Sequence, residues 1–428
     1  MNRDRLAELD RAHVVHPHQT VGHPAEPLIV VRGSGAVLTD ADGREYLDGT
    51  CGLWQCAVGH GRAELADVAR DQMAELEFYA SFWDLSNPPS IELAARLAAL
   101  SPVGLGHVFF TNGGSEGVET AIKLVRLARH ASGEPERTVI LTRKMAYHGV
   151  GYGSLSATGI PPLREGFGPL AAGFVHLTAP QPLHMPDCTD SCVAELERTI
   201  AEVGAGRIAA MIGEPILGVG GMIPPPDDYW PRMSEVLRRH GIMLILDEIV
   251  TAYGRTGHWF AAERWGGIAA DVIVTAKALT SGYLPLGAVL IGDRLMGMLD
   301  GTRLSHGFTY NGHPTCCAVA LRNLEIIERE GLLGHAAEMG ARLLDRLAPA
   351  TDLPAVAEVR GVGLMAGIEL HPPADGAGLA DRVRSAGVIV RATGQKVVLS
   401  PPLVIAPEQI DRLAEVLVTE LERTPVAA

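Results

Sequence analysis

Lysine is scarce in this chain, which limits where amine chemistry could take place. Among 428 residues the sequence holds only four lysines, Lys123, Lys144, Lys277 and Lys396, against 32 arginines. A reaction that requires a primary amine on a side chain therefore has four candidates. Cysteine is sparse as well: the six cysteines include no Cys-x-x-Cys pair, and this usage fits a reducing compartment.

Positive charge and long apolar runs are lacking too. The 50 acidic residues outnumber the 36 basic ones and give a net charge of −14, so the surface should repel nucleic acid and anionic lipid. The longest apolar runs, such as residues 242–246, are far too short to span a bilayer, and the first residues contain no apolar segment that would mark the chain for secretion. These absences predict a cytoplasmic protein that binds neither nucleic acid nor membrane.

Composition and the order of predicted elements favour an α/β protein with two lobes. Apolar residues make up 47% of the chain and charged residues 20%, as in globular proteins with a large core. The first 60 residues are loop-rich, and from about residue 105 strand-like and helix-like segments alternate. After Pro314 two long helices lead into short strands. We expect an N-terminal segment over residues 1–62, a large domain over 63–312 and a C-terminal domain over 313–428, with both chain ends forming a small α+β lobe.

Several strands of the large domain are continuous apolar runs. This pattern is typical of a mostly parallel sheet that helices cover on both faces. The predicted strands of this sheet lie at residues 107–111, 138–142, 208–214, 242–247, 272–276 and 286–291. The predicted helices lie at residues 63–78, 91–100, 116–130, 192–203, 228–240, 315–330, 333–347 and 407–422. Short strands of the small lobe are predicted at residues 358–361, 364–370, 388–391 and 397–399.

Chemically active residues follow three of the predicted strands. A Gly-rich turn at residues 112–116 runs straight into a helix, Asp247 and Glu248 end a second strand, and Lys277 follows a third. Free N–H groups at a helix start favour a phosphate, and ligands of open α/β sheets bind outside the carboxyl ends of the strands. Each feature alone is also explained as a tight turn, a helix cap or a solvated lysine. Their joint placement on one edge favours a single site.

Two kinds of site could use these groups. A nucleoside triphosphatase needs a phosphate loop that ends in Gly-Lys, and none of the four lysines follows a glycine, so this reading fails. A pyridoxal phosphate (PLP) enzyme needs a lysine, a carboxylate, an aromatic ring and a phosphate site, and all are available here. His184, Cys188 and Cys192 have the four-residue spacing of metal ligands on a helix, but Pro186 interrupts that helix, so no metal site is expected.

Two segments then carry a recognisable family pattern. LDEIVTAYGRTG at residues 246–257, followed by TAKALTSGYLPLGA at residues 275–288, resembles the signature of the class III PLP-dependent aminotransferases. The similarity extends over nearly the whole chain. It includes YLDG at 46–49, GLW at 52–54, YHG at 147–149, EP at 214–215, HGFT at 306–309 and SPPL at 400–403. The resemblance implies PLP fold type I, like that of aspartate aminotransferase.

The resemblance also implies roles for individual residues toward PLP. Lys277 would form a Schiff base with the cofactor and move a proton, and Asp247 would pair with the pyridine nitrogen. Tyr147 and Ile249 would contact the two ring faces. The residues implied in cofactor binding are Gly114, Ser115, Tyr147, His148, Glu214, Asp247, Ile249, Lys277 and Thr309. Thr309 would act from the neighbouring subunit, which implies a homodimer with shared active sites, or a tetramer built from such dimers.

The residues that the resemblance places in the substrate pocket are similar to those of the ω-transaminases. Family members that transaminate 4-aminobutyrate often carry an arginine where this chain has Val150, whereas ω-transaminases pair a small apolar residue there with Trp54 and a mobile arginine at Arg391. Phe82 matches a pocket aromatic, beside the small Ser81. We therefore predict amino transfer from a primary amine or ω-amino acid to a keto acid such as pyruvate. The alternatives are an aminomutase or decarboxylating transaminase of the same fold, and a cofactor-binding protein without turnover.

Overall fold

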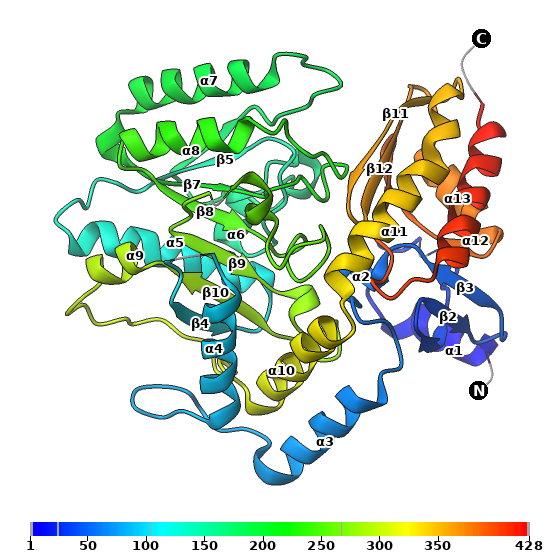
Figure 1. The fold of residues 1–428 in the computed structure, drawn as a ribbon, viewed down its shortest axis with the longest axis horizontal. Coiled ribbons are helices and arrows are strands. Elements are labelled where there is room, and N and C mark those ends of the chain that lie inside the picture. The colour runs from blue at the N-terminus through cyan, green and yellow to red at the C-terminus, as the bar shows by residue number, and fades with distance from the viewer. Residues whose placement is uncertain (1–2, 24, 103, 267, 426–428) are drawn as a thin grey trace.

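A seven-stranded sheet forms the centre of the larger part of the molecule (Figure 1). In the computed structural model of the protein, residues 3–23, 25–102, 104–266 and 268–425 are described. The strand order is β4-β10-β9-β8-β7-β5-β6, and only β10 runs opposite to the others. The strands are β4 (His107–Thr111), β5 (Val139–Arg143), β6 (Phe174–Leu177), β7 (Ile208–Gly213), β8 (Met243–Asp247), β9 (Val272–Thr275) and β10 (Gly287–Ile291). The predicted mostly parallel sheet is confirmed.

Helices bury both faces of this sheet, which explains the continuous apolar runs. On β8, Met243 and Ile245 pack in one core cluster with residues of α5 (Gly114–Ala131). Leu244 and Leu246, which alternate with them, belong to a second cluster that contains residues of α7 (Cys188–Val203) and α8 (Tyr229–Arg239). Because successive side chains of a strand point to opposite faces, every position of β8 is apolar until Asp247.

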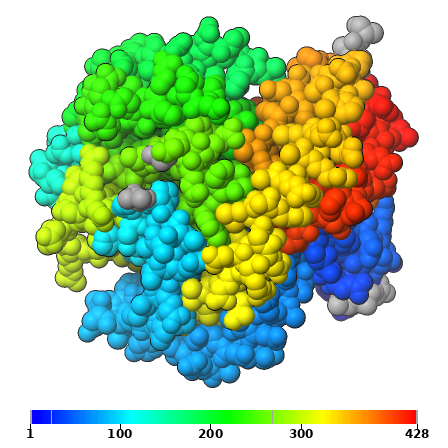
Figure 2. Space-filling view, in the orientation of Figure 1, coloured from blue at the N-terminus to red at the C-terminus, as the bar shows by residue number. Residues whose placement is uncertain are grey.

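The chain ends meet in a second lobe. One sheet joins β1 (Val30–Ser34), β2 (Val37–Asp40), β3 (Glu45–Asp48) and β13 (Val388–Ile389). A second sheet joins β11 (Val356–Val362), β12 (Met365–Leu370), β15 (Lys396–Leu399) and β14 (Arg391–Thr393). The helices of this lobe include α11 (Leu332–Leu347), α12 (Gly376–Ser385) and α13 (Pro407–Glu422). In Figure 2 the blue N-terminal and the orange-red C-terminal segments lie against each other. The small α+β lobe is therefore present, and the exact domain boundaries remain a prediction.

Three helices connect the lobes. α10 (Pro314–Arg329) packs against α3 (Ala63–Leu76) and α4 (Pro88–Leu100). α4 has a side-chain cap at its start, because the Asn87 side chain accepts the backbone N–H of Ser90 at 3.0 Å. α10 also lies beside the segment that follows Lys277, since the Asn323 side chain donates to the carbonyls of Ala278 and Leu279.

The prediction of a single strand over residues 388–391, which include the predicted site residue Arg391, is wrong. Residues 388–391 form two strands in two different sheets. Val388 and Ile389 pair with β3, whereas Arg391 begins β14 and lies opposite Val398 of β15. The sequence shows one continuous segment of strand-like residues, and only the tertiary pairing divides it. The N-terminal stretch, predicted as loop-rich, also contains helix α1 (Arg3–His13), whose short polar sequence buries only Ala7.

His184 lies before α7, and its Nε2 is 2.8 Å from Glu369 Oε1. Among the described residues, no group of three or more His, Cys, Asp or Glu side chains is placed to hold a metal ion. Within the same ranges, every helix is too short or too polar to cross a membrane.

Candidate active site

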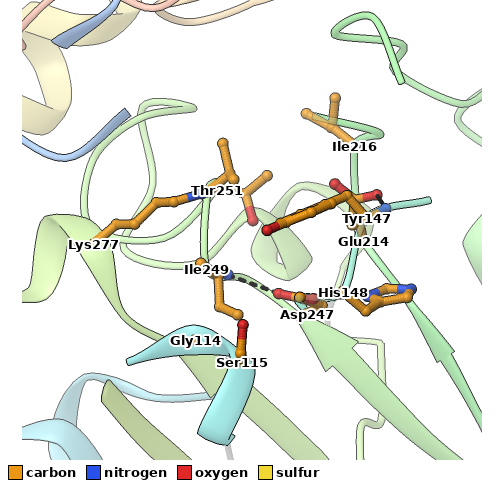
Figure 3. A pocket seen from close by; sticks show the side chains of 12 residues that line it. Gly114, Ser115, Tyr147, His148, Glu214, Ile216, Asp247, Ile249, Thr251 and Lys277 are labelled. Carbon is orange, nitrogen blue, oxygen red and sulfur yellow. Dashed lines mark hydrogen bonds and ion pairs between the residues drawn. The ribbon is translucent and has the colours of Figure 1, made fainter. Parts of the chain in front are cut away.

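A cavity opens at the carboxyl ends of the central strands, where the sequence predicted a site (Figure 3). Residues from several strand ends and the start of α5 line it. They are Gly114, Ser115, Tyr147, His148, Gly149, Glu214, Ile216, Asp247, Ile249, Val250, Thr251 and Lys277. Eight of the predicted cofactor-binding residues thus lie around one cavity.

Asp247 ends β8 and is fixed by two partners. Its Oδ2 lies 2.7 Å from Nδ1 of the fully buried His148, and its Oδ1 accepts the backbone N–H of Ile249 at 3.2 Å. An ionised carboxylate only accepts hydrogen bonds, so His148 Nδ1 carries the shared proton. Among the described residues, His148 Nε2 has no hydrogen-bond partner. The result is a fixed negative charge at the cavity wall.

Lys277 approaches the cavity from the end of β9. It has a backbone φ of 44°, and its Nζ lies 4.9 Å from the centre of the Trp54 ring. Burial lowers the pKa of Lys277 to about 8, although the charges of Asp247 and Glu214 oppose this effect. A lower pKa increases the fraction of neutral amine, which is the nucleophilic form.

The start of α5 provides an anion-binding surface. Ser115 Oγ accepts the backbone N–H of Val150 at 3.2 Å, and the first turn of α5 leaves backbone N–H groups free of intrahelical partners. A Cβ on Gly114 would lie 2.6 Å from Ile249 Cδ1, and one on Gly149 would lie 2.5 Å from Ser115 Oγ. At Gly149, which also has a φ of 121°, a side chain would collide with Ser115, and at Gly114 it would press on Ile249, so both glycines allow this close packing around the start of α5.

Glu214 holds the segment that carries Tyr147. Its Oε1 accepts the backbone N–H of Tyr147 at 3.1 Å, and its Oε2 accepts that of Gly218 at 2.8 Å. Burial raises the pKa of Glu214. The side chain of Tyr147 projects into the cavity in Figure 3. Glu214 therefore acts at least as a support for Tyr147, and it adds negative potential near Lys277.

The two lobes meet at Trp54. The Arg391 guanidinium carbon lies 5.1 Å from the centre of the Trp54 ring, and Lys277 Nζ lies 4.9 Å from it. Burial lowers the pKa of Arg391, so its charge is poorly hydrated. The small lobe thus brings one cation to the edge of a site built mainly by the large sheet.

Three other predicted residues lie away from the cavity. Phe82 lines a separate cavity together with Trp83 and His306, and Thr309 is exposed. Val150 is 62% exposed, although its backbone N–H bonds to Ser115. Within one chain, the structure does not bring Phe82 and Thr309 to the Lys277 cavity.

The comparisons with known proteins identify the family. Residues 19–421 match the family model Aminotransferase class-III. The chain belongs to the class III aminotransferases. It is 39% identical to the putrescine--pyruvate aminotransferase of Pseudomonas aeruginosa over 93% of this chain and 91% of that protein.

Solved structures agree with this family. An (S)-enantioselective omega-transaminase from Thermomicrobium roseum matches with a TM-score of 0.95 and 45% identity, over 99% of both chains. A PLP-bound amine transaminase from an uncultivated Pseudomonas species matches with a TM-score of 0.92 and 40% identity, over 96% of this chain and 98% of that chain. The predicted family, fold type I and PLP as cofactor are confirmed.

The residues present in this class III aminotransferase fit PLP. The cavity offers an amine at Lys277, a fixed carboxylate at Asp247 and an anion-binding helix start at Gly114 and Ser115. These groups match an aldehyde, a protonated pyridine nitrogen and a phosphate in chemical type. Among the described residues, no side chain caps the first turn of α5, so its N–H groups can serve a phosphate.

Glu248 has a supporting role that its sequence pattern did not predict. It follows Asp247 and is fully buried, and its carboxylate accepts the Thr251 hydroxyl and the backbone N–H groups of Ala261 and Ala262. In this aminotransferase it ties the segment after β8, which includes Ile249 and Thr251, to the large domain. The sequence does not reveal these three hydrogen bonds to Glu248. Two of the donors are backbone N–H groups of Ala261 and Ala262, which lie more than ten residues further along the chain and have no polar side chains.

Lowering the pH from 7 to 5 should stabilise this aminotransferase through Glu248. Burial raises the pKa of Glu248 from 4.5 to about 7, so the folded state binds more protons than the unfolded state between these values. The free energy of unfolding contributed by Glu248 therefore falls by about 2 kcal/mol as the pH rises from 5 to 7. Because the glutamine of Glu248→Gln does not titrate, the Tm of wild type minus the Tm of this variant should be more positive at pH 5 than at pH 7.

The exposed Glu263 provides a matched control for this experiment. Glu263→Gln removes a carboxylate from the same segment but leaves Glu248 in place. The Tm difference between wild type and Glu263→Gln should change less between pH 5 and pH 7. A difference for Glu248→Gln that is the same at both pH values would contradict the prediction.

Proposed function

We propose that this class III aminotransferase transfers an amino group from a primary amine or an ω-amino acid to a keto acid such as pyruvate. The observation that supports this most directly is the joint placement of Lys277, Asp247 and the start of α5 around one cavity, with Arg391 beside the Trp54 ring that Lys277 also contacts. The names of two relatives describe amino transfer of this kind. One is a putrescine--pyruvate aminotransferase, and the other is an (S)-enantioselective omega-transaminase.

We assign the residues as follows. When bound, PLP supplies an aldehyde that condenses with amines and a ring that accepts electrons from the substrate carbon. Lys277 Nζ holds the cofactor and moves the proton. Asp247 keeps the pyridine nitrogen protonated, since a cation is favoured beside a fixed carboxylate. His148 and Glu214 hold Asp247 and Tyr147 in place.

Other residues of the cavity wall contact the phosphate and the ring of the cofactor. The start of α5 at Gly114 and Ser115 binds the phosphate, with the helix dipole adding to the backbone N–H groups. Tyr147 and Ile249 enclose the ring and exclude water from it. Each of these residues lies at the cavity surface.

We propose that the active form is a homodimer in which a second copy completes the site. Phe82 and Thr309 lie outside the Lys277 cavity of their own chain. Large exposed apolar residues surround them in sequence, including Tyr79, Trp83 and Tyr310, of which Trp83 is 88% exposed. Exposed aromatic groups of this kind mark protein interfaces. A second chain would cover them and bring Thr309 to the phosphate and Phe82 to the substrate pocket.

We also propose a cytoplasmic location. All six cysteines are free in the structure, and five of them are buried. Unpaired buried thiols are typical of proteins that work in a reducing compartment.

A panel of donor amines with pyruvate tests the proposed function. An aminotransferase forms alanine only when both an amine and pyruvate are present. An aminomutase would convert its substrate without an acceptor, a decarboxylating transaminase would release carbon dioxide, and a cofactor-binding protein would give no product. Alanine formed without loss of carbon dioxide supports the proposal, and any of the other three results contradicts it.

Arg391→Ala should impair the use of pyruvate much more than the use of an uncharged amine. A guanidinium can bind a carboxylate through two hydrogen bonds, and a desolvated pair of this kind contributes about 2–5 kcal/mol. An apolar amine gains nothing from that charge, so Arg391 must turn away when such an amine binds. We therefore expect the KM for pyruvate to rise by about 30-fold or more, as the lower end of that energy predicts. The half-reaction with 1-phenylethylamine should change little.

Arg382 is a suitable control, because it lies in the same lobe and pairs with Glu420. Arg382→Ala should leave the KM for pyruvate unchanged. Equal losses with pyruvate and with 1-phenylethylamine in Arg391→Ala would mean that Arg391 supports the fold or the cofactor instead of recognising the carboxylate.

A further inference from the structure

Trp54 reaches the active site on a turn with unfavourable backbone conformation. The turn is α2 (Cys51–Trp54), which follows β3. Cys51, Gly52 and Trp54 have φ values of 54°, 66° and 63°. Residues with a side chain rarely adopt such values, and they persist only where surrounding contacts determine the conformation. The indole nevertheless is almost fully buried and contacts both Lys277 and Arg391.

The carboxylate of Asp48 makes the contacts that hold this turn. Its side chain has no exposed surface. Oδ1 accepts the backbone N–H of Thr50 at 3.0 Å and lies 2.9 Å from the Thr50 hydroxyl, and Oδ2 accepts the backbone N–H of Gly52 at 2.7 Å. Asp48 therefore binds the backbone on both sides of Cys51, where the positive φ values begin.

His60 is the remaining partner of this carboxylate. Its Nε2 lies 2.9 Å from Asp48 Oδ2, and its backbone exchanges hydrogen bonds of 3.0 and 2.8 Å with Gly35. The hydrogen bond to Asp48 raises the pKa of His60 to about 10, so the imidazole is a cation at neutral pH. Asp48 thus links the turn to an ion pair whose other member is fixed to the β1–β2 hairpin.

We infer that Asp48 and His60 are positioning residues that set the affinity for amine and keto acid by holding the Trp54 indole against Lys277 and Arg391. This inference rests on the proposed function. Neither residue lines the Lys277 cavity, and Asp48 bonds directly to the turn, so we expect its effect on substrate to pass through Trp54. Asp48 also pairs with Ile389 of β13, and measurements in a Trp54→Ala background separate the two routes. Loss of the ion pair should leave Lys277 and Asp247 intact and should change KM more than kcat.

Asp40 allows a matched comparison. Its carboxylate accepts two backbone N–H groups, from Asp42 and Arg44, and the hydroxyl of Tyr46. It lies in the same sheet as Asp48 but holds the β2–β3 turn, which does not lead to Trp54. Asp48→Asn and Asp40→Asn each remove one negative charge from a carboxylate that accepts several hydrogen bonds. In each variant the NH₂ group of the new asparagine lies opposite at least one hydrogen-bond donor, so both variants lose a hydrogen bond as well as a charge.

The experiment measures KM, kcat and Tm of both variants with 1-phenylethylamine and pyruvate. We expect both to lower Tm, but only Asp48→Asn to raise both KM values, by about tenfold, as for the loss of a charge-assisted hydrogen bond. The variants are then repeated with Trp54→Ala. If Asp48 acts through the indole, Asp48→Asn should cause no further rise in KM once Trp54 is absent.

The His60 variants keep the test decisive if Asp48→Asn does not fold. His60→Ala should raise KM several-fold, and His60→Gln, whose amide can donate to Asp48, should recover part of it. KM values equal to those of Asp40→Asn, or a rise that persists in the Trp54→Ala background, would overturn the inference. If wild type converts no amine with pyruvate, the proposed function fails instead, so the two failures are distinguishable.

Discussion

Replacing Lys277 with alanine should abolish transamination while leaving the fold intact. Lys277 is the only one of the four lysines that lines the cavity beside Asp247. Its amine is the group that can bond to the cofactor and carry the proton, so no neighbouring side chain can replace it. We expect turnover to fall by at least about 10⁴-fold, the combined effect of losing a nucleophile and a general base. Steady-state alanine formation and thermal unfolding measure the two parts of this prediction.

Borohydride reduction gives an independent readout of the same residue. In wild type it should attach the cofactor covalently to a peptide that contains Lys277, and in Lys277→Ala no peptide should carry the label. Lys277→Arg keeps a cation but should also lack label and turnover. The exposed Lys144 is the control, since Lys144→Ala should retain both. Label on Lys123, Lys144 or Lys396 would show that the assignment is wrong.

Elements with a regular apolar pattern were predictable from the sequence. β4 and α13 have the predicted bounds, and β8 begins one residue later than predicted. In these segments the apolar pattern alone determines the conformation. The pattern failed at residues 388–391, because a short apolar run does not reveal that the chain pairs first with β3 and then with β15.

The position of the site was predictable from the sequence. Strand ends predicted that Asp247, Lys277 and the start of α5 converge, and they line one cavity. The supporting contacts were not predictable. Glu248 bonds to backbone groups of Ala261 and Ala262, and Asp48 bonds to backbone groups within a strained turn. Backbone N–H groups carry no signal in the amino-acid sequence, so acidic residues that bind them look like any other buried carboxylate.

Asp247→Asn should leave a protein that binds PLP more weakly and turns over slowly. Asparagine has nearly the same shape, so the hydrogen bonds to His148 and Ile249 can be made in part. The substitution removes the negative charge that stabilises a protonated pyridine nitrogen, and with it the ability of the ring to accept electrons. Removal of one preorganised electrostatic group from an active site reduces kcat by about 10²- to 10³-fold, and we expect a loss of at least this size.

The buried Asp271 separates this effect from a general loss of stability. Asp271 accepts the backbone N–H of Leu244 at the opposite end of the same sheet, and its pKa is raised by burial. Asp271→Asn should lower Tm but leave kcat and the Kd for PLP close to those of wild type. For Asp247→Asn we expect the reverse: a small change in Tm, an increased Kd for PLP by fluorescence titration, and slow single-turnover kinetics at saturating PLP. Near-normal turnover at saturating PLP would mean that the ring is activated by another group. His148 would then be the first candidate, since its buried Nε2 has no hydrogen-bond partner within the part of the chain that the structure describes.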